Sequence, residues 1–489
     1  MHPKTNLFFI GLAVLASACR TAPPSPPNSR PEPPATPAPT VETRKPSESP
    51  TDPVAQWVDT YVAALGVDDE TQAFHGSFLL ARGPRVVASG TYRARPGRRY
   101  RIGSVTKPFT AVAIVQLAAA GKLSLDDSLR SFIPELPDTH RAITLEQVLS
   151  HRSGLGSYTE NEALMATRQR PRSRKEMIQV IAQEPLRFPA GEKWAYSNSG
   201  YFLLGVVIER VAGQSYPEYL RQHVFAPAGM SETSTTDAAL AAPLTVREGA
   251  LAPADPVDVS IPFAAGALVS TTRDMHRFAL ALRGDALLSR RWRDEMWRDR
   301  GGPTPELGWG LGWMIREHEG KITVGHNGGI DGFRSHFEMH RDGDEIVVAL
   351  SRLESFAAGD VATPALQMML TGKAVPPPEP PAYLAFDGDH CGRFAGAYEV
   401  APSTLEKLSG KIGPEAAASI ATVTLRCDDA RYLLKPVGQD EFELKRRDDG
   451  VLAQPRIKVE VVAETPSADG VVSALTLKQG GLRVPYRRR

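Results

Sequence analysis

Tyr100-Arg-Ile-Gly-Ser-Val-Thr-Lys107, followed by the apolar stretch Pro108–Ala120, is the part of the sequence that decides the fold. Pro108–Ala120 carries no charge and is followed by Gly121, which predicts a helix buried on nearly every side. Ser104 and Lys107 stand three residues apart at the start of this helix, so they share one of its faces. The unpaired N–H groups and the positive dipole end at a helix start favour a nucleophilic oxygen and a developing oxyanion.

A Ser-x-x-Lys spacing also arises by chance, as a capping serine and a surface lysine, but two further segments accompany it here. Tyr196-Ser-Asn198 is expected on a loop before the helix Ser199–Ala212, and His326-Asn-Gly328 follows the strand-like run Lys321–Val324. A tyrosine beside a lysine amine can relay the proton of a serine, and an asparagine amide can bind both a substrate amide and the lysine. A glycine-rich strand edge can pair with an extended substrate and present an N–H to its carbonyl.

The elements expected around these segments indicate an α+β domain. Gly76–Tyr92 predicts a β-hairpin about a Gly-Pro turn, and Thr271 with Asp274 has the spacing of a helix N-terminal capping box. Four strand-like runs come late in this region: Trp313–Ile315, Lys321–Val324, Arg334–His340 and Glu345–Leu350. Strands at both ends with helices between them imply an antiparallel sheet built from distant parts of the chain, flanked by helices and accompanied by a helical lobe.

The pattern changes after five prolines between Pro376 and Pro381. Short alternating runs follow, and no stretch with a helical period rivals them: Ala421–Arg426, Tyr432–Leu434, Phe442–Leu444, Ile457–Val462 and Val471–Leu477. They predict a small antiparallel β domain, barrel-like, over residues 383–489. Cys391 and Cys427 fall within it and either form one disulfide or stay as two buried free thiols.

Composition excludes several classes of protein. The 489 residues are about three times a typical domain, and 57 Lys and Arg against 56 Asp and Glu give a net charge of +1. This balance argues against a nucleic-acid binder with a broad basic face. Three cysteines are too few for a disulfide scaffold or an iron–sulfur protein.

The first residues are typical of a targeting signal. Met1–Cys19 has a basic residue at Lys4, an apolar run over Leu7–Leu15 and small residues before Cys19, and it resembles a lipoprotein signal peptide in which Cys19 is lipidated. A cleaved secretory signal without lipidation is the alternative. Residues 20–53 contain 12 prolines in 34 positions and are expected to form a disordered, stiff spacer. We therefore expect an exported, membrane-anchored protein that faces the periplasm or the cell exterior.

The serine–lysine, tyrosine–asparagine and histidine–glycine segments, in this order, resemble the serine β-lactamase and penicillin-binding protein superfamily. The class C-type branch, which also holds D,D-peptidases, D-aminopeptidases and esterases, is the most similar. Further segments carry the resemblance: Gly121-Lys-Leu-Ser-Leu-Asp-Asp127, Val148-Leu-Ser-His-Arg-Ser-Gly-Leu155, Tyr196-Ser-Asn-Ser-Gly-Tyr201 and Gly308-Trp-Gly-Leu-Gly-Trp313. It covers a hydrolase domain over 54–372 with a β-lactamase/transpeptidase-like fold, followed by a linker over 373–382. Relatives with a C-terminal extension suggest a lipocalin-like domain over 383–489.

The resemblance implies a role for each residue of the site. Ser104 would be the acylated nucleophile, Lys107 its partner in proton transfer, and Tyr196 the general base that later protonates the leaving group. Asn198 would position the substrate. The reaction would be acyl transfer through a serine ester, with no metal and no cofactor.

His326 stands where many relatives have lysine, and with Gly328 it would bind substrate, while the amides of Ser104 and Gly329 would form the oxyanion hole. A histidine is mostly neutral at pH 7, so a substrate carboxylate would lose an electrostatic partner unless Arg334 supplies one. We therefore expect hydrolysis of a small ester, amide or D-amino-acid-containing peptide bond in a small-molecule or peptidoglycan-like substrate.

Two alternatives stay open: a class C-like β-lactamase, and a non-catalytic sensor or scaffold that binds cell-wall fragments or antibiotics. The oligomeric state also stays open. His151 and Trp309 are both expected to have structural roles, the latter in strand packing.

Overall fold

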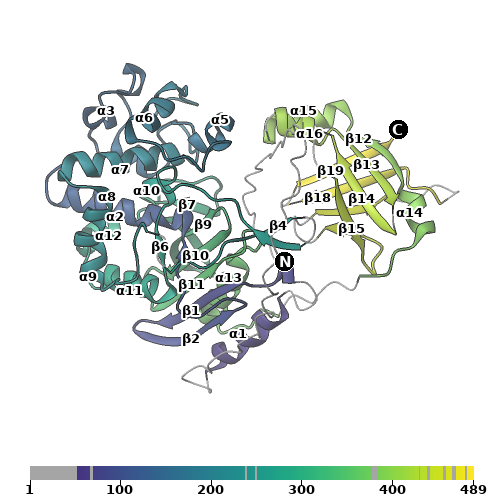
Figure 1. Cartoon of the computed structure of the whole chain (residues 1–489), viewed down its shortest axis with the longest axis horizontal. Coiled ribbons are helices and arrows are strands. Elements are labelled where there is room, and N and C mark those ends of the chain that lie inside the picture. Colours follow the sequence, from purple (N-terminus) through teal and green to yellow (C-terminus); the bar gives the residue numbers. More distant parts are fainter. Residues whose placement is uncertain are drawn as a thin grey trace, which may run out of the picture. The chain divides into compact units, whose positions relative to one another are not determined.

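The computed structural model describes residues 52–65, 70–236, 239–247, 250–376, 383–412, 414–428, 430–437, 441–454, 459–464, 470–479 and 482–489. They form two compact units, one within 52–376 and the other within 383–489 (Figure 1). The expected signal peptide with Cys19, the Pro-rich segment as far as residue 51, and residues 377–382 of the expected linker lie outside the described residues. None of the helices in the described ranges is both long and apolar enough to cross a membrane.

The first unit is built on a seven-stranded antiparallel sheet with the strand order β2-β1-β11-β10-β9-β8-β7. Gly76 pairs with Ser351, so strands from the two ends of the unit lie side by side, as the sequence predicted. The strands are β1 (Gly76–Arg82), β2 (Arg85–Tyr92), β7 (Leu307–Trp309), β8 (Met314–His318), β9 (Lys321–Ile330), β10 (Phe333–His340) and β11 (Glu345–Ser351). Two short ladders join β3 (Tyr100–Arg101) to β6 (Val269–Ser270) and β4 (Leu244–Arg247) to β5 (Ala250–Pro253).

The sheet is buried on both faces because its strands are apolar at successive positions. Phe78 and Leu80 pack in one core, which also contains residues of α1 (Pro53–Ala64) and α13 (Gly359–Thr371). Leu79 and Ala81, which point the opposite way along β1, pack in the other core. Trp57 of α1 donates a hydrogen bond from its indole nitrogen to the carbonyl of Val375 at 2.7 Å, which ties the two ends of the unit together.

Helices cover the second face of the sheet and form a helical lobe, which we define as residues 129–228 (Figure 1). The central helix α2 (Thr106–Ala119) is buried along most of its length, as predicted, and begins two residues before the expected start. The other helices of this unit are α3 (Leu129–Phe132), α4 (Leu145–Leu149), α5 (Glu162–Met165), α6 (Arg174–Gln183), α7 (Asn198–Ala212), α8 (Tyr216–Leu220), α9 (Ala226–Ala228), α10 (Phe263–Gly266), α11 (Thr272–Arg283) and α12 (Arg290–Met296). Single turns lie at Glu70–Gln72, Gly103–Val105, Asp138–His140 and Tyr158–Glu160, and Arg221–Phe225 is π-helical.

Local signals in the sequence account for several element boundaries. The hydroxyl of Thr271 accepts a hydrogen bond from the Asp274 amide at 3.2 Å and starts α11. Gly213, with φ of 68°, ends α7 in the left-handed conformation that glycine adopts at little cost. Strand β9 is the main difference, because it continues six residues past Val324, through the glycine-rich segment, to Ile330.

The second unit is a closed antiparallel barrel of eight strands, which confirms the predicted β-barrel-like domain. Its strands are β12 (Gly396–Glu399), β13 (Thr422–Asp428), β14 (Arg431–Pro436), β15 (Phe442–Arg446), β16 (Leu452–Gln454), β17 (Val459–Ala463), β18 (Ala474–Gln479) and β19 (Leu482–Arg488). Strand β12 pairs with β19 and closes the barrel. Tyr398 and Tyr486 are among its largest buried side chains.

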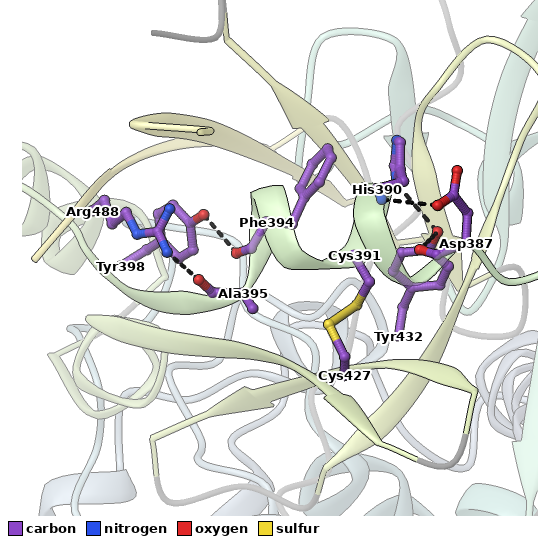
Figure 2. The surroundings of a disulfide bond; sticks show 9 residues. All are labelled: Asp387, His390, Cys391, Phe394, Ala395, Tyr398, Cys427, Tyr432 and Arg488. Carbon is purple, nitrogen blue, oxygen red and sulfur yellow. Dashed lines mark hydrogen bonds between the residues drawn. A yellow bond between two sulfur atoms is a disulfide. The ribbon is translucent and has the colours of Figure 1, made fainter. Parts of the chain in front are cut away.

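Three helices accompany the barrel, although the sequence showed no competing helical period there: α14 (Gly388–Phe394), α15 (Pro402–Ile412) and α16 (Pro414–Ser419). This expectation missed the helical spacing of Leu405 and Leu408, which stand three residues apart on α15 and both pack in the barrel core. Cys391 of α14 and Cys427 of β13 form a disulfide with Cα atoms 6.0 Å apart (Figure 2). Tyr432 also holds this helix, because its hydroxyl donates to the Asp387 carbonyl at 3.2 Å (Figure 2).

Candidate active site

Ser104 and Lys107 meet at the start of the buried helix α2. Ser104 lies in the turn Gly103–Val105, which leads directly into α2, and Lys107 lies in the first turn of the helix. The lysine Nζ is 3.0 Å from the Ser104 hydroxyl, 2.8 Å from Oδ1 of Asn198 and 2.9 Å from the carbonyl of Ala265. Three acceptors therefore surround one amine that is 0% exposed.

Complete burial changes the chemistry of this amine. Desolvation disfavours its charged form and lowers the pKa of Lys107 well below the usual range. The amine lies 4.7 Å from the centre of the Tyr196 ring and 5.5 Å from that of Tyr201. An amine with a lowered pKa, in contact with a serine hydroxyl, is able to accept the proton of that hydroxyl.

Tyr196 and Asn198 are placed by the start of α7. The Ser197 hydroxyl between them caps the helix by accepting from the Gly200 amide at 3.1 Å. Burial raises the pKa of Tyr196, and its hydrogen bond with Ser104 opposes that rise only in part. The Asn198 amide is held at both ends, since its Oδ1 faces Lys107 and its Nδ2 donates to the hydroxyls of Ser157 at 3.3 Å and Thr159 at 3.2 Å.

His326 lies on β9, buried against aromatic rings. Its Nδ1 donates to the Asn327 carbonyl at 2.5 Å, which leaves Nε2 as a hydrogen-bond acceptor with no partner among the described residues. The ring centres of Trp309 and Tyr196 lie 5.4 Å and 6.3 Å away. Burial and the nearby Lys107 lower the pKa of His326 to about 3, so the imidazole is neutral at physiological pH.

The end of β9 forms the open edge of the site. Strand β8 pairs with β9 only as far as Gly325, so Asn327 and Gly329, both exposed, face no strand on that side. A Cβ on Gly328 would lie 2.1 Å from the Ile102 carbonyl, which explains why this position needs glycine. Gly103 also requires glycine, because it has φ of 49° and a Cβ there would meet the Gly329 backbone at 2.8 Å.

These two close approaches bring the Ser104 and Gly329 backbones to the same side of the site, where their amides were expected to form an oxyanion hole. Arg334 lies beside them, since its Nη1 would be 3.1 Å from a Cβ on Gly329. A cationic side chain therefore lies beside the Gly329 end of β9.

The structure thus places Ser104, Lys107, Tyr196, Asn198 and His326 in one connected set of contacts. Sequence reasoning missed the Ala265 carbonyl and the hydroxyls of Ser157 and Thr159. A main-chain carbonyl leaves no signal in the residue type, and the two hydroxyls come from a loop whose path the sequence does not show. No group of three or more His, Cys, Asp or Glu side chains within the described ranges is placed to hold a metal ion.

Comparisons with known proteins agree with this geometry. The Beta-lactamase family model matches residues 54–368. Penicillin-binding protein 4* of Bacillus subtilis (strain 168) is 25% identical over 417 residues, which cover 77% of this chain and 91% of that protein. A D-stereospecific amidohydrolase from Streptomyces sp. is 28% identical with a TM-score of 0.58 and covers 65% of this chain and 99% of its own.

A third match extends over both units. The octameric penicillin-binding protein homologue from Pyrococcus abyssi covers 88% of this chain and 98% of its own, with a TM-score of 0.57. At 22% identity this likeness concerns the fold alone. The family match, the fold and the relatives agree, and the chain belongs to the Beta-lactamase family, in the superfamily of serine hydrolases that contains penicillin-binding proteins and D-amino acid amidases.

Proposed function

We propose that this protein hydrolyses a small ester, amide or D-amino-acid-containing peptide bond through an acyl-enzyme on Ser104. The observation that carries this proposal is the wholly buried Lys107 amine, 3.0 Å from the Ser104 hydroxyl. An amine whose pKa is lowered by burial can, at that distance, accept the serine proton without a separate histidine base. A protein that only bound its ligand would gain nothing from burying a lysine in this way.

Acylation begins with transfer of the Ser104 hydroxyl proton to the Lys107 amine, while the serine oxygen forms a bond to the substrate carbonyl carbon. The carbonyl oxygen becomes an oxyanion and accepts hydrogen bonds from the Ser104 and Gly329 amides. Tyr196 has a raised pKa and keeps its proton in the resting state, which suits it to donate that proton to the leaving oxygen or nitrogen. Lys107 then returns a proton to the phenolate.

Deacylation repeats these steps with water in place of the serine. The same groups remove a proton from the attacking water, the bond between the acyl carbon and the serine oxygen breaks, and Ser104 recovers its proton. Asn198 holds the amine in place throughout, because its Oδ1 accepts from Lys107 and its Nδ2 is fixed by Thr159.

His326 and Arg334 bear on which substrates the site can accept. A neutral His326 gives no attraction to a carboxylate, which favours esters and amino-acid amides over β-lactams. The likeness to a D-stereospecific amidohydrolase supports a D-amino-acid amide as the first substrate to try. Arg334 is the specific observation that keeps class C-like β-lactamase activity as a second candidate, because it could bind a β-lactam carboxylate at the Gly329 edge.

The test is a substrate panel with the full chain. It contains p-nitrophenyl esters, the p-nitroanilides of D- and L-phenylalanine, and a chromogenic cephalosporin, each tested against wild type, Ser104→Ala and the exposed control Ser131→Ala. We expect ester or D-anilide turnover that Ser104→Ala abolishes and Ser131→Ala retains. Rapid cephalosporin turnover would support the second candidate, and absence of both turnover and fluorophosphonate labelling would favour a binding protein.

We also propose that the protein is exported and anchored through a lipid on Cys19, which rests on the signal-like segment Met1–Cys19 alone. Metabolic labelling with an alkyne fatty acid, in a bacterial host that processes lipoproteins, tests this proposal. We expect labelled protein in the membrane fraction, and we expect Cys19→Ser to lose the label. Unlabelled, secreted wild type would show a plain secretory signal instead.

A further inference from the structure

The proposed reaction does not use His151, although this side chain is 0% exposed and lies against the tyrosine of the site. Its ring centre is 4.4 Å from that of Tyr196 and 5.0 Å from that of Trp309. From the sequence, only a structural role was expected for His151 and Trp309. The contact with Tyr196 places His151 one side chain away from the reacting groups.

His151 binds the backbone on each side of Tyr196. Its carbonyl accepts a hydrogen bond from the Ala195 amide at 2.9 Å, and its Nδ1 accepts one from the Ser197 amide at 3.1 Å. One residue therefore fixes both neighbours of the phenol and packs its ring against the phenol itself. These three contacts together restrict where the backbone and the ring of Tyr196 can lie.

The backbone of His151 is adapted to this arrangement. Its φ is 58°, in the left-handed region that is uncommon for residues other than glycine, although histidine adopts it more often than most. Because Nδ1 accepts from a backbone amide, the neutral ring carries its proton on Nε2, which has no hydrogen-bond partner among the described residues. A strained backbone and an unpartnered buried N–H both carry a cost that a residue chosen only for packing would not require.

Charge explains why a neutral ring is suited to this position. Burial, with Lys107 and His326 nearby, lowers the pKa of His151 well below the usual range. A protonated imidazole here would repel the ammonium that Lys107 becomes when it accepts the Ser104 proton. His151 thus supplies an acceptor and a flat surface without adding a cation beside the reacting amine.

We propose that His151 is a positioning residue, which holds the Tyr196 hydroxyl at Ser104 and the Tyr196 ring against Lys107 through the Ala195 and Ser197 amides. The proposal rests on the proposed function, since it assigns His151 to the proton transfer of that same reaction. His151 does not touch the reacting atoms and acts through Tyr196. A misplacement of about 1 Å at a reacting group costs on the order of 10²-fold in rate.

Two substitutions separate positioning from packing. In His151→Asn the side-chain Oδ1 can accept from the Ser197 amide and the residue tolerates a positive φ, whereas His151→Phe keeps an aromatic ring and loses the acceptor. His140 is a matched control, because it is a histidine 1% exposed with an unpartnered Nε2 that contacts none of the site residues described above. Its variant is His140→Phe.

Three quantities are measured for each full-length variant: kcat and KM with p-nitrophenyl acetate, the rate of Ser104 labelling by a fluorophosphonate, and hydrogen exchange of the peptide spanning residues 194–200. We expect His151→Phe to lower kcat and the labelling rate by about 10²-fold with KM changed by less than about threefold. We expect exchange of the Ser197 amide to become faster. His151→Asn should restore all three values to within about tenfold of wild type.

The control variant and the hydrogen-exchange data distinguish a positioning role of His151 from a packing role and from failure of the proposed function. His140→Phe should lower the melting temperature and leave kcat unchanged. The proposal is overturned if His151→Phe lowers only the melting temperature, or if His151→Asn and His151→Phe lose activity equally. If wild type shows neither turnover nor labelling, the proposed function fails, and hydrogen exchange at residues 194–200 still decides whether His151 fixes this segment.

Discussion

The Nζ atom of Lys107 lies 2.8 Å from Oδ1 of Asn198, on a side chain whose other end is bonded to Ser157 and Thr159. The amide is therefore fixed with its oxygen toward the amine, and it presents an acceptor that carries no net charge. An uncharged acceptor holds the amine without favouring the ammonium over the free amine as strongly as a carboxylate would.

Replacing this amide by a carboxylate should move the pH dependence of the reaction. In Asn198→Asp the negative charge favours the ammonium form and raises the pKa of Lys107, so less free amine is present at neutral pH. We expect the rising limb of the kcat/KM profile to shift to higher pH by about 1–3 units, with lower activity at pH 7 and recovery in alkali. Initial rates measured from pH 5 to pH 10 give the kcat/KM profiles of wild type and variant. A lower kcat with an unmoved profile would show that Lys107 is not the group that titrates.

Gly328→Ala tests the close approach of β9 to the turn before Ser104. The added Cβ would fall 2.1 Å from the Ile102 carbonyl and 2.3 Å from the Ser335 hydroxyl, so strand and turn must move apart. We expect a loss of about 1–3 kcal/mol in the free energy of unfolding, and a lower kcat because the oxyanion hole widens. A Cβ on Gly392 of α14 would meet no atom within 4 Å, so Gly392→Ala should preserve both quantities. Urea denaturation and kcat for both variants provide the check.

The buried carboxylate of Glu338 should make the first unit sensitive to acid. It is 1% exposed and lies 2.8 Å from His336, 3.3 Å from Arg316, 3.4 Å from His318 and 2.5 Å from the Thr323 hydroxyl. Burial by itself would raise the pKa of Glu338, but Arg316 and the two histidines outweigh it and hold that pKa well below the usual range.

A carboxyl pKa lowered by folding stabilises the folded state above the unfolded-state value of about 4.3, and this contribution is lost as the pH falls through the folded-state pKa. Glu338→Gln should therefore lower the free energy of unfolding at pH 7 by about 3–5 kcal/mol, because Arg316 is left without its buried partner. The difference in free energy of unfolding between variant and wild type should become smaller below pH 4. A difference that stays constant from pH 7 to pH 3, measured by urea denaturation, would contradict the predicted acid sensitivity.

The disulfide between Cys391 and Cys427 should stabilise the barrel unit. It closes a loop with a sequence separation of 36 residues, for which the chain-entropy estimate is about 3–4 kcal/mol. We expect Cys391→Ser with Cys427→Ser to lower the melting temperature of the barrel unit, and reduction of wild type by dithiothreitol to have the same effect. Calorimetry of the oxidised, reduced and doubly substituted chains measures the melting temperature of the barrel unit. Equal melting temperatures for all three would refute the prediction.

Much of the site was predictable because it depends on local sequence. The uncharged run after Lys107 predicts a buried helix, and a Ser-x-x-Lys pair at its start fixes the two side chains on one face whatever surrounds them. The glycines at 328 and 329 predict a close backbone approach. These features follow from helix geometry and from steric limits within a few residues.

The features that the sequence did not predict depend on contacts between segments that are far apart in the chain. The six extra residues of β9 are strand because β10 pairs with them, although glycine and asparagine disfavour strands locally. His151 gains its contacts from Ala195 and Ser197, more than forty residues later in the chain, so its own sequence neighbours could not show them. Among the helices beside the barrel, α14 is held by its disulfide to β13, and Leu408 of α15 and Ala417 of α16 pack in the barrel core, contacts that join residues far apart in the chain.

The hydrogen bond between Trp57 and Val375 has a consequence for engineering. The first and last helices of this unit, α1 and α13, are in contact with each other. The fold of the unit should therefore tolerate a change in the order of its segments along the chain. A circular permutant that joins these two helices by a short Gly-Ser connection and opens the exposed turn at Pro96 and Gly97 would keep every strand pair of the sheet. Such a rearranged chain would free the ends of the hydrolase unit for fusion to other domains at a new place on its surface.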